Sequence, residues 1–167
     1  FHFLKQYENS AISSQQFFDE CRKLLESSTK QKKFAKDLFN ALSGRATEFF
    51  QFETTHKALA RSDAFLFTLV DLKLTDEWIE NFLPYWYSLA RPILLLDDFK
   101  DLPEDRQSKD ENTIIELGNN ADGIRAAYEL GIKDLEKLGT INPQLAKYML
   151  GSFKESLQYE HIKTELG

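Results

Sequence analysis

Apolar residues recur every three or four positions along most of the chain, which is the spacing of one face of an α-helix. Polar residues that favour N-caps precede several of these stretches, among them Ser13, Thr75 and Asn142. Alternation typical of a strand never persists for more than a few residues. The predicted helices span residues 13–27, 30–59 with a bend or break at Ser43 and Gly44, 58–72, 78–102, 112–118, 121–139 and 144–166.

Two prolines fall inside the longest apolar segment, 78–102. Pro84 and Pro92 each remove an internal hydrogen bond, so this helix is expected to be kinked or split at one of them. The polar residues between Leu102 and Asn112, with Pro103, are expected to form an exposed loop. The pattern therefore predicts an all-α bundle of six or seven helices, with residues 1–167 as a single domain.

Composition narrows the classes of function. The chain has 14 Phe and a formal net charge of −6, which provides material for a large core and argues against nucleic acid as a partner. The basic run Lys30–Lys36 is interpreted as a solvated helix face. One cysteine, Cys21, excludes an internal disulfide and fits a reducing compartment, where we expect it to be a buried thiol.

The longest apolar runs are shorter than a membrane span, and no signal peptide is visible, so we expect no transmembrane segment and a cytoplasmic location. The chain begins at Phe1 rather than Met, which leaves open that it is part of a longer chain. The sequence is also compatible with a homodimer.

The stretch with the most candidate ligand residues is RPILLLDDFKDLPEDR, residues 91–106. On a helix, Asp97, Asp98 and Asp101 lie on one arc of about 100° and repel one another, and a cation would reverse that repulsion. The stripe through Leu89 and Ile93 predicts that Asp97 points into the bundle. Clustered carboxylates suit Mg²⁺, which is commonly shared with a substrate phosphate. The alternative is a helix end in a solvated acidic loop.

This stretch resembles the Asp-Asp-x-x-Asp motif of the class I isoprenoid synthases, the all-α superfamily of prenyl diphosphate, squalene/phytoene and terpene synthases. The similarity extends over about residues 50–165, with Lys57 upstream of the motif and two amphipathic helices after it. The resemblance implies that Asp97, Asp98 and Asp101 hold Mg²⁺ and that Lys57 meets the diphosphate of a prenyl ligand. These enzymes carry two acidic motifs, and this sequence holds one, so binding without turnover stays open.

Two other hypotheses belong to different classes of protein. Glu53 and His56 form Glu-x-x-His, the unit of di-iron helical bundles, whereas the expected mate before His161 has Gln158 in place of the carboxylate. Glu20 and Glu129 are the remaining candidate ligands of such a site. A third hypothesis is a non-enzymatic helical domain that binds an apolar ligand or a partner protein.

Aromatic residues flank Pro84 and are candidates for lining an apolar pocket, although core positions are the more common role of such residues. They are Trp78, Tyr85, Trp86 and Tyr87. The sequence shows neither a triad-like arrangement of serine and histidine nor a glycine-rich phosphate loop, so the hydrolase and nucleotide-dependent classes are set aside. No catalytic residue is assigned.

Overall fold

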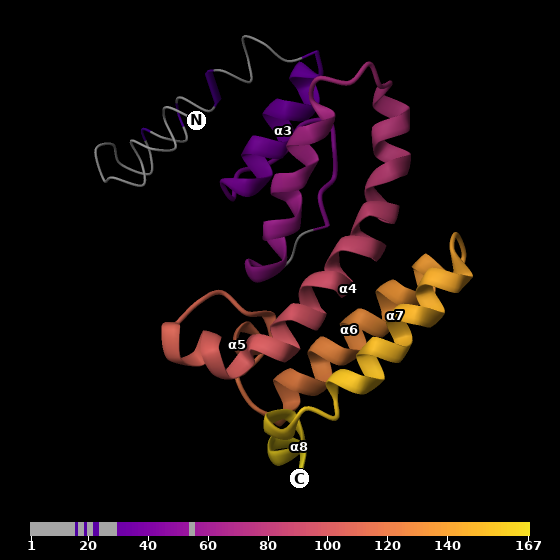
Figure 1. Ribbon diagram of the computed structural model, residues 1–167. Coiled ribbons are helices and arrows are strands. Elements are labelled where there is room, and N and C mark those ends of the chain that lie inside the picture. Colours follow the sequence, from indigo (N-terminus) through magenta and orange to yellow (C-terminus); the bar gives the residue numbers. More distant parts are fainter. Residues whose placement is uncertain (1–15, 17–18, 20–21, 24–29, 54–55) are drawn as a thin grey trace. The chain divides into compact units, whose positions relative to one another are not determined.

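The computed structural model describes residues 16, 19, 22–23, 30–53 and 56–167. The described part is all-α, as predicted, with seven helical elements and no strand (Figure 1). These elements are α3 (Lys32–Leu42), the 3₁₀ helix η1 (Ala58–Leu69), α4 (Asp76–Ser108), α5 (Thr113–Glu116), α6 (Ala121–Gly139), α7 (Pro143–Ser156) and α8 (Glu160–Leu166). Most of the helix predicted for residues 13–27, with Cys21 and Glu20, lies outside the described residues.

The chain divides into two compact units, Phe1–Phe52 with Phe65–Ile79 and Glu53–Ala64 with Glu80–Gly167. The prediction of a single domain stays a prediction. No described helix has the length and apolar character needed to cross a membrane.

The first unit is organised by α3 and the loop that follows it. Phe34 is fully buried and meets the rings of Phe50 and Phe52, with centroids 5.3 and 6.1 Å away. The buried carboxylate of Asp37 accepts backbone N–H groups from Glu48 and Phe50 at 3.0 and 2.9 Å. One side chain of α3 therefore fixes the course of the loop.

The prediction of a helix over residues 45–53 is wrong. Gly44 has a φ of +66°, which ends α3, and the N–H groups of Glu48 and Phe50 go to Asp37 instead of to carbonyl groups four residues back. The basic run Lys30–Lys36 lies in this unit. Lys33 pairs with Asp76 and Lys36 with Glu48, at 3.4 and 2.6 Å.

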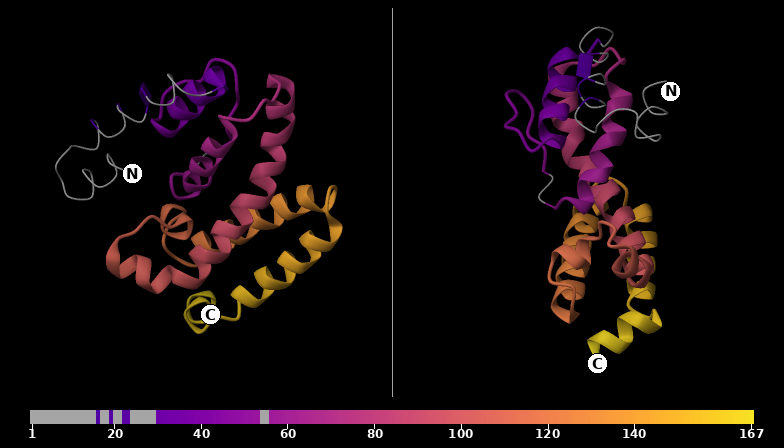
Figure 2. Two further views of the ribbon diagram at one scale, coloured as in Figure 1. Left: turned by 45° about the horizontal axis from the view of Figure 1, so that its top comes forward. Right: turned by 90° about the vertical axis from the view of Figure 1, so that its left-hand side faces the viewer.

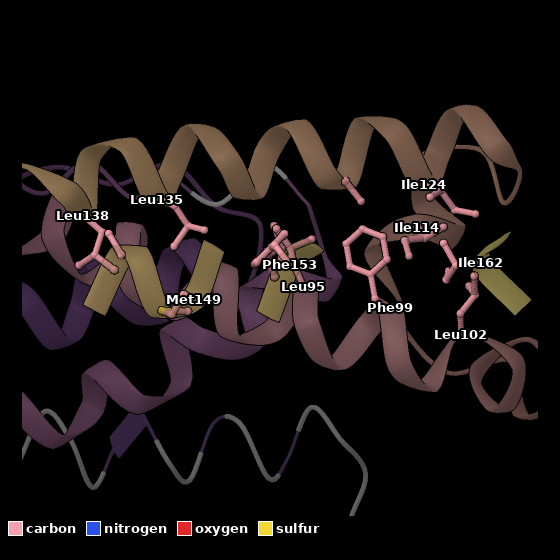
Figure 3. Packing of buried hydrophobic residues seen from close by; sticks show 13 residues of the cluster. Leu95, Phe99, Leu102, Ile114, Ile124, Leu135, Leu138, Met149, Phe153 and Ile162 are labelled. Carbon is pink, nitrogen blue, oxygen red and sulfur yellow. The ribbon is translucent and has the colours of Figure 1, made fainter. Parts of the chain in front are cut away.

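The second unit has its own apolar core, which α4, α5, α6, α7 and α8 build together. Figure 3 shows Phe99 of α4 and Phe153 of α7 turned toward one another beside Ile124 of α6. The rings of Phe99 and Phe153 meet edge to face at 6.1 Å, and both are fully buried. Helices α6 and α7 run side by side as an antiparallel pair (Figure 2).

Helices α6 and α7 of this unit begin at polar residues whose side chains cap them. The side chain of Asn120 accepts the N–H groups of Asp122 and Gly123, and that of Asn142 accepts the N–H of Leu145. The predicted start of the last long helix at Asn142 and Pro143 is confirmed. That helix is however not continuous, because the chain turns at residues 157–159 and begins again as α8.

Helix α4 differs from its prediction in two ways. It is not split, since it runs through Pro84, Pro92 and Pro103 without a break. Residues 103–108, expected as part of a loop, are its last turns. Tertiary contacts outweigh the hydrogen bond that each proline removes, as the contact at Pro103 illustrates.

Pro103 frees a carbonyl that α8 then uses. In a regular helix the Phe99 carbonyl accepts the N–H of residue 103, but proline has none. Nε2 of His161 lies 2.8 Å from this oxygen and donates to it, because a carbonyl can only accept. Arg106 also pairs with Glu165, and this hydrogen bond lowers the pKa of Glu165. The end of α4 is thus the platform on which α8 packs.

Gly131 provides a test of the core. An alanine there would place its Cβ 2.2 Å from Cε1 of Phe153, whose ring is fully buried. We expect Gly131→Ala to lower the free energy of unfolding by about 1–3 kcal/mol in urea denaturation. The control Gly151→Ala, with no atom near the new Cβ, should raise it by roughly 0.5–1 kcal/mol. Equal effects of the two variants would contradict this packing.

A double-mutant cycle tests the contact between His161 and the Phe99 carbonyl. His161→Ala should cost about 1–2 kcal/mol in chemical denaturation, because a buried carbonyl loses its donor. In a Pro103→Ala background, the N–H of residue 103 supplies that carbonyl, so the cost should fall by about 1 kcal/mol. The same cost of His161→Ala in both backgrounds would show that Phe99 does not depend on the imidazole.

Candidate binding groove

The aspartates of the acidic motif lie in different surroundings. Asp98 is 1% exposed, and its Oδ1 accepts from Nη2 of Arg61 at 2.6 Å. Its Oδ2 accepts the N–H of Thr113 at 2.9 Å. Asn112 donates to the backbone carbonyl of Asp98 at 2.8 Å and caps α5 with its own side-chain oxygen. Asp98 therefore joins η1, α4 and α5 within the second unit.

Burial raises the pKa of Asp98, since desolvation of the charged form outweighs the opposing hydrogen bonds from Thr113 and Arg61 and the positive charge of Arg61. The same cause raises the pKa of Asp134, which is 1% exposed and faces Arg91 with Nε and Oδ2 2.8 Å apart. Both acids are held by arginine inside the protein. Neither offers a free carboxylate to a ligand.

The expectation that Asp97 points into the bundle is wrong. Asp97 is exposed, and its neighbour Asp98 is the buried residue. Asp101 is half-buried and lies 3.4 Å from the ammonium of Lys100. The side chain of Lys57 is 78% exposed and pairs with Glu111, whose hydrogen bond raises the pKa of the lysine. The three aspartates do not form one ligand face.

A magnesium site does not fit these contacts. Across residues 30–53 and 56–167, together with the few described before them, no group of three His, Cys, Asp or Glu side chains could hold a metal ion. Both oxygens of Asp98 already accept hydrogen bonds from the protein. Binding of Mg²⁺ and diphosphate through Asp97, Asp98, Asp101 and Lys57 stays a prediction, without support from the geometry.

The residues of the di-iron hypothesis also have other partners. Glu53 lies 3.6 Å from Arg91 and 3.7 Å from Lys137. His56 lies 3.8 Å from Glu116, and His161 donates to the Phe99 carbonyl. Iron binding likewise stays a prediction that these contacts do not favour.

An open groove of about 490 Å³ lies between α4 and the C-terminal half of α7. This volume is in the range of small-ligand sites. Its lining consists of Ile93, Leu94, Leu96, Asp97 and Lys100 from α4, and Ser152, Glu155 and Tyr159 from α7 and the turn after it. The groove thus has aliphatic walls, with two carboxylates and one ammonium among them.

Apolar side chains remain exposed along both sides of this groove. Ile93 is 52% exposed, and Tyr85, two helical turns earlier on the same face of α4, is also 52% exposed. On α7, Tyr148 is 73% exposed and precedes Ser152 by one turn. Large apolar residues gathered on one surface are a feature of interaction sites.

The groove carries negative charge that the described residues do not neutralise. No hydrogen bond or ion pair within the described part of the chain engages the carboxylate of Asp97 or of Glu155, whereas Lys100 is beside Asp101. The 18 acidic and 12 basic side chains of Glu53–Ala64 and Glu80–Gly167 account for the whole net charge of −6. A site in this unit therefore favours cationic groups.

The aromatic residues around Pro84 have mixed roles. Tyr87 is buried and lies under the guanidinium of Arg91, Trp86 is half-buried, and Trp78 and Tyr85 are exposed. Sequence reasoning did not find the groove itself. The available signal was the spacing of Tyr85, Leu89, Ile93 and Leu96, which places apolar residues on one face of α4 and Asp97 beside them.

Comparisons with protein-family models, with curated proteins and with solved structures give no match for this chain. A function must therefore be argued from the contacts described above.

Paired alanine variants separate a structural from a ligand-binding role of the motif. Asp98→Ala removes the acceptor of a buried N–H and the counterion of Arg61, and should cost about 2–3 kcal/mol of unfolding free energy. Asp97→Ala removes an exposed carboxylate and should change stability by less than about 0.5 kcal/mol. Urea denaturation measures both, and a similar cost for the two would contradict the described burial.

Proposed function

We propose that this chain is a non-enzymatic helical binding domain and that the α4–α7 groove is its binding site. The observation that carries the proposal is the groove itself, where aliphatic side chains meet two carboxylates that have no partner among the described residues. Exposed apolar residues continue beyond it at Tyr85 and Tyr148. Such a surface suits a ligand with an apolar face and polar edges.

The environment of the two buried acids, Asp98 and Asp134, supports a role without turnover. General acid–base or metal chemistry needs a carboxylate that reaches a substrate. Asp98 and Asp134 instead face Arg61 and Arg91 in the protein interior, and Asp98 also fixes the start of α5 through Thr113. These contacts favour a structural role for both acids.

Binding of an uncharged apolar dye tests whether the groove accepts apolar groups. Nile red should gain fluorescence with the native chain, and Ile93→Glu should reduce that gain several-fold, because the new carboxylate lies on the groove wall. The matched control is Ile141→Glu, since Ile141 is 49% exposed in the turn between α6 and α7 and does not line the groove. Equal fluorescence with both variants would reject the groove as the binding site.

A thermal melt with Mg²⁺ and pyrophosphate tests the competing isoprenoid-synthase hypothesis. We expect no rise in the melting temperature, because Asp98 is already engaged. A rise that Asp97→Asn abolishes would support the magnesium and diphosphate prediction. Circular dichroism of each variant establishes that it is folded.

A further inference from the structure

We infer that the natural occupant of the α4–α7 groove is a basic amphipathic helix of a partner protein. This inference rests on the proposed function and adds the chemistry of the ligand. It follows from three properties of the surface: its unpaired charge, its length and its apolar anchors.

The charge argument begins with Asp97 and Glu155. Both carboxylates line the groove, and neither has a partner among the described residues. An occupant that covers the groove removes water from them, and leaving a charge unpaired in such a place is costly. Lysine or arginine side chains on the occupant would pair with the two carboxylates, whereas a neutral ligand would leave both without compensation.

The length argument favours a helix over a compact small molecule. From Ile93 to Lys100 the groove wall extends about 10 Å along α4, at about 1.5 Å per residue. The exposed face continues back to Tyr85, for a total of about 22 Å. About 15 helical residues cover that distance. Helix α7 runs in the same direction as α4 (Figure 1), so Tyr148, one turn before Ser152, extends the opposite side of the groove and a third helix can lie between the two.

The apolar anchors set the pattern of the partner. Ile93 and Leu96 from α4 and Tyr159 after α7 provide aliphatic and aromatic contacts on the groove. A helix that inserts leucine or a similar residue every third or fourth position places those side chains on one line. Its basic residues then flank that line and meet Asp97 and Glu155. A second copy of this unit fits less well, because the unit carries the whole net charge of −6.

Two labelled 15-residue peptides test the inference. They share the same leucine positions at helical spacing, and one carries lysine where the other carries glutamate. Fluorescence anisotropy with the full chain should show binding of the lysine peptide that is at least tenfold tighter, and added salt should weaken it. The double variant Asp97→Lys/Glu155→Lys should reverse the preference between the two peptides.

The control is Glu129→Lys/Glu136→Lys, which makes the same change in net charge on exposed positions of α6 away from the groove. It should keep the preference for the lysine peptide. If the control loses the preference as fully as the groove variant, overall charge and not the groove governs binding, and the inference is wrong.

The remaining outcomes separate this inference from the proposed function. If both peptides bind equally and Ile93→Glu weakens both, the groove is a binding site but its occupant is not basic. If neither peptide binds while Nile red still requires Ile93, the groove takes an apolar ligand and the helix is rejected. If Nile red binding is also insensitive to Ile93→Glu, the proposed function fails together with the inference.

Discussion

The carboxylate of Asp98 is the point on which the second unit depends. It holds Arg61 of η1 and the first N–H of α5, while Asn112 binds the backbone of the same residue. A buried acid of this kind must have its oxygens satisfied, and here the protein satisfies both. The arrangement connects α4 to Arg61, 37 residues earlier in the sequence, and to Thr113, 15 residues later. Because both oxygens of Asp98 accept hydrogen bonds from the protein, the central carboxylate of the acidic motif is not available to a ligand.

Pairing of this type recurs inside the unit. Asp134 of α6 faces Arg91 of α4, and Glu165 of α8 faces Arg106 near the end of α4. Helix α4 thus pairs with α6 through Arg91 and with α8 through Arg106. The Phe99 carbonyl, which Pro103 leaves without a backbone donor, accepts from His161. A motif rich in acids can therefore be a structural device. Within the groove, the carboxylates left for recognition are those of Asp97 and Glu155.

The resemblance of the acidic motif and the tertiary environment of its residues point to different functions. Asp-Asp-x-x-Asp requires that its carboxylates share a face toward a ligand, and helical spacing permits this for Asp97, Asp98 and Asp101. Spacing does not specify which side of the helix is covered. Successive residues differ by about 100° on a helix, so Asp97 faces solvent while Asp98 is buried. The proposed binding function follows from what remains exposed.

The sequence by itself determined the all-α class, the short helix after Asn112, the start of α6, and the cap of α7 at Asn142, because these depend on local periodicity and on neighbouring residues. Tertiary structure decided that residues 45–53 follow the Asp37 carboxylate and that α4 continues through three prolines. It also decided which face of α4 is the core. Each of these depends on partners distant in sequence, which periodicity cannot identify when a helix is apolar on several sides.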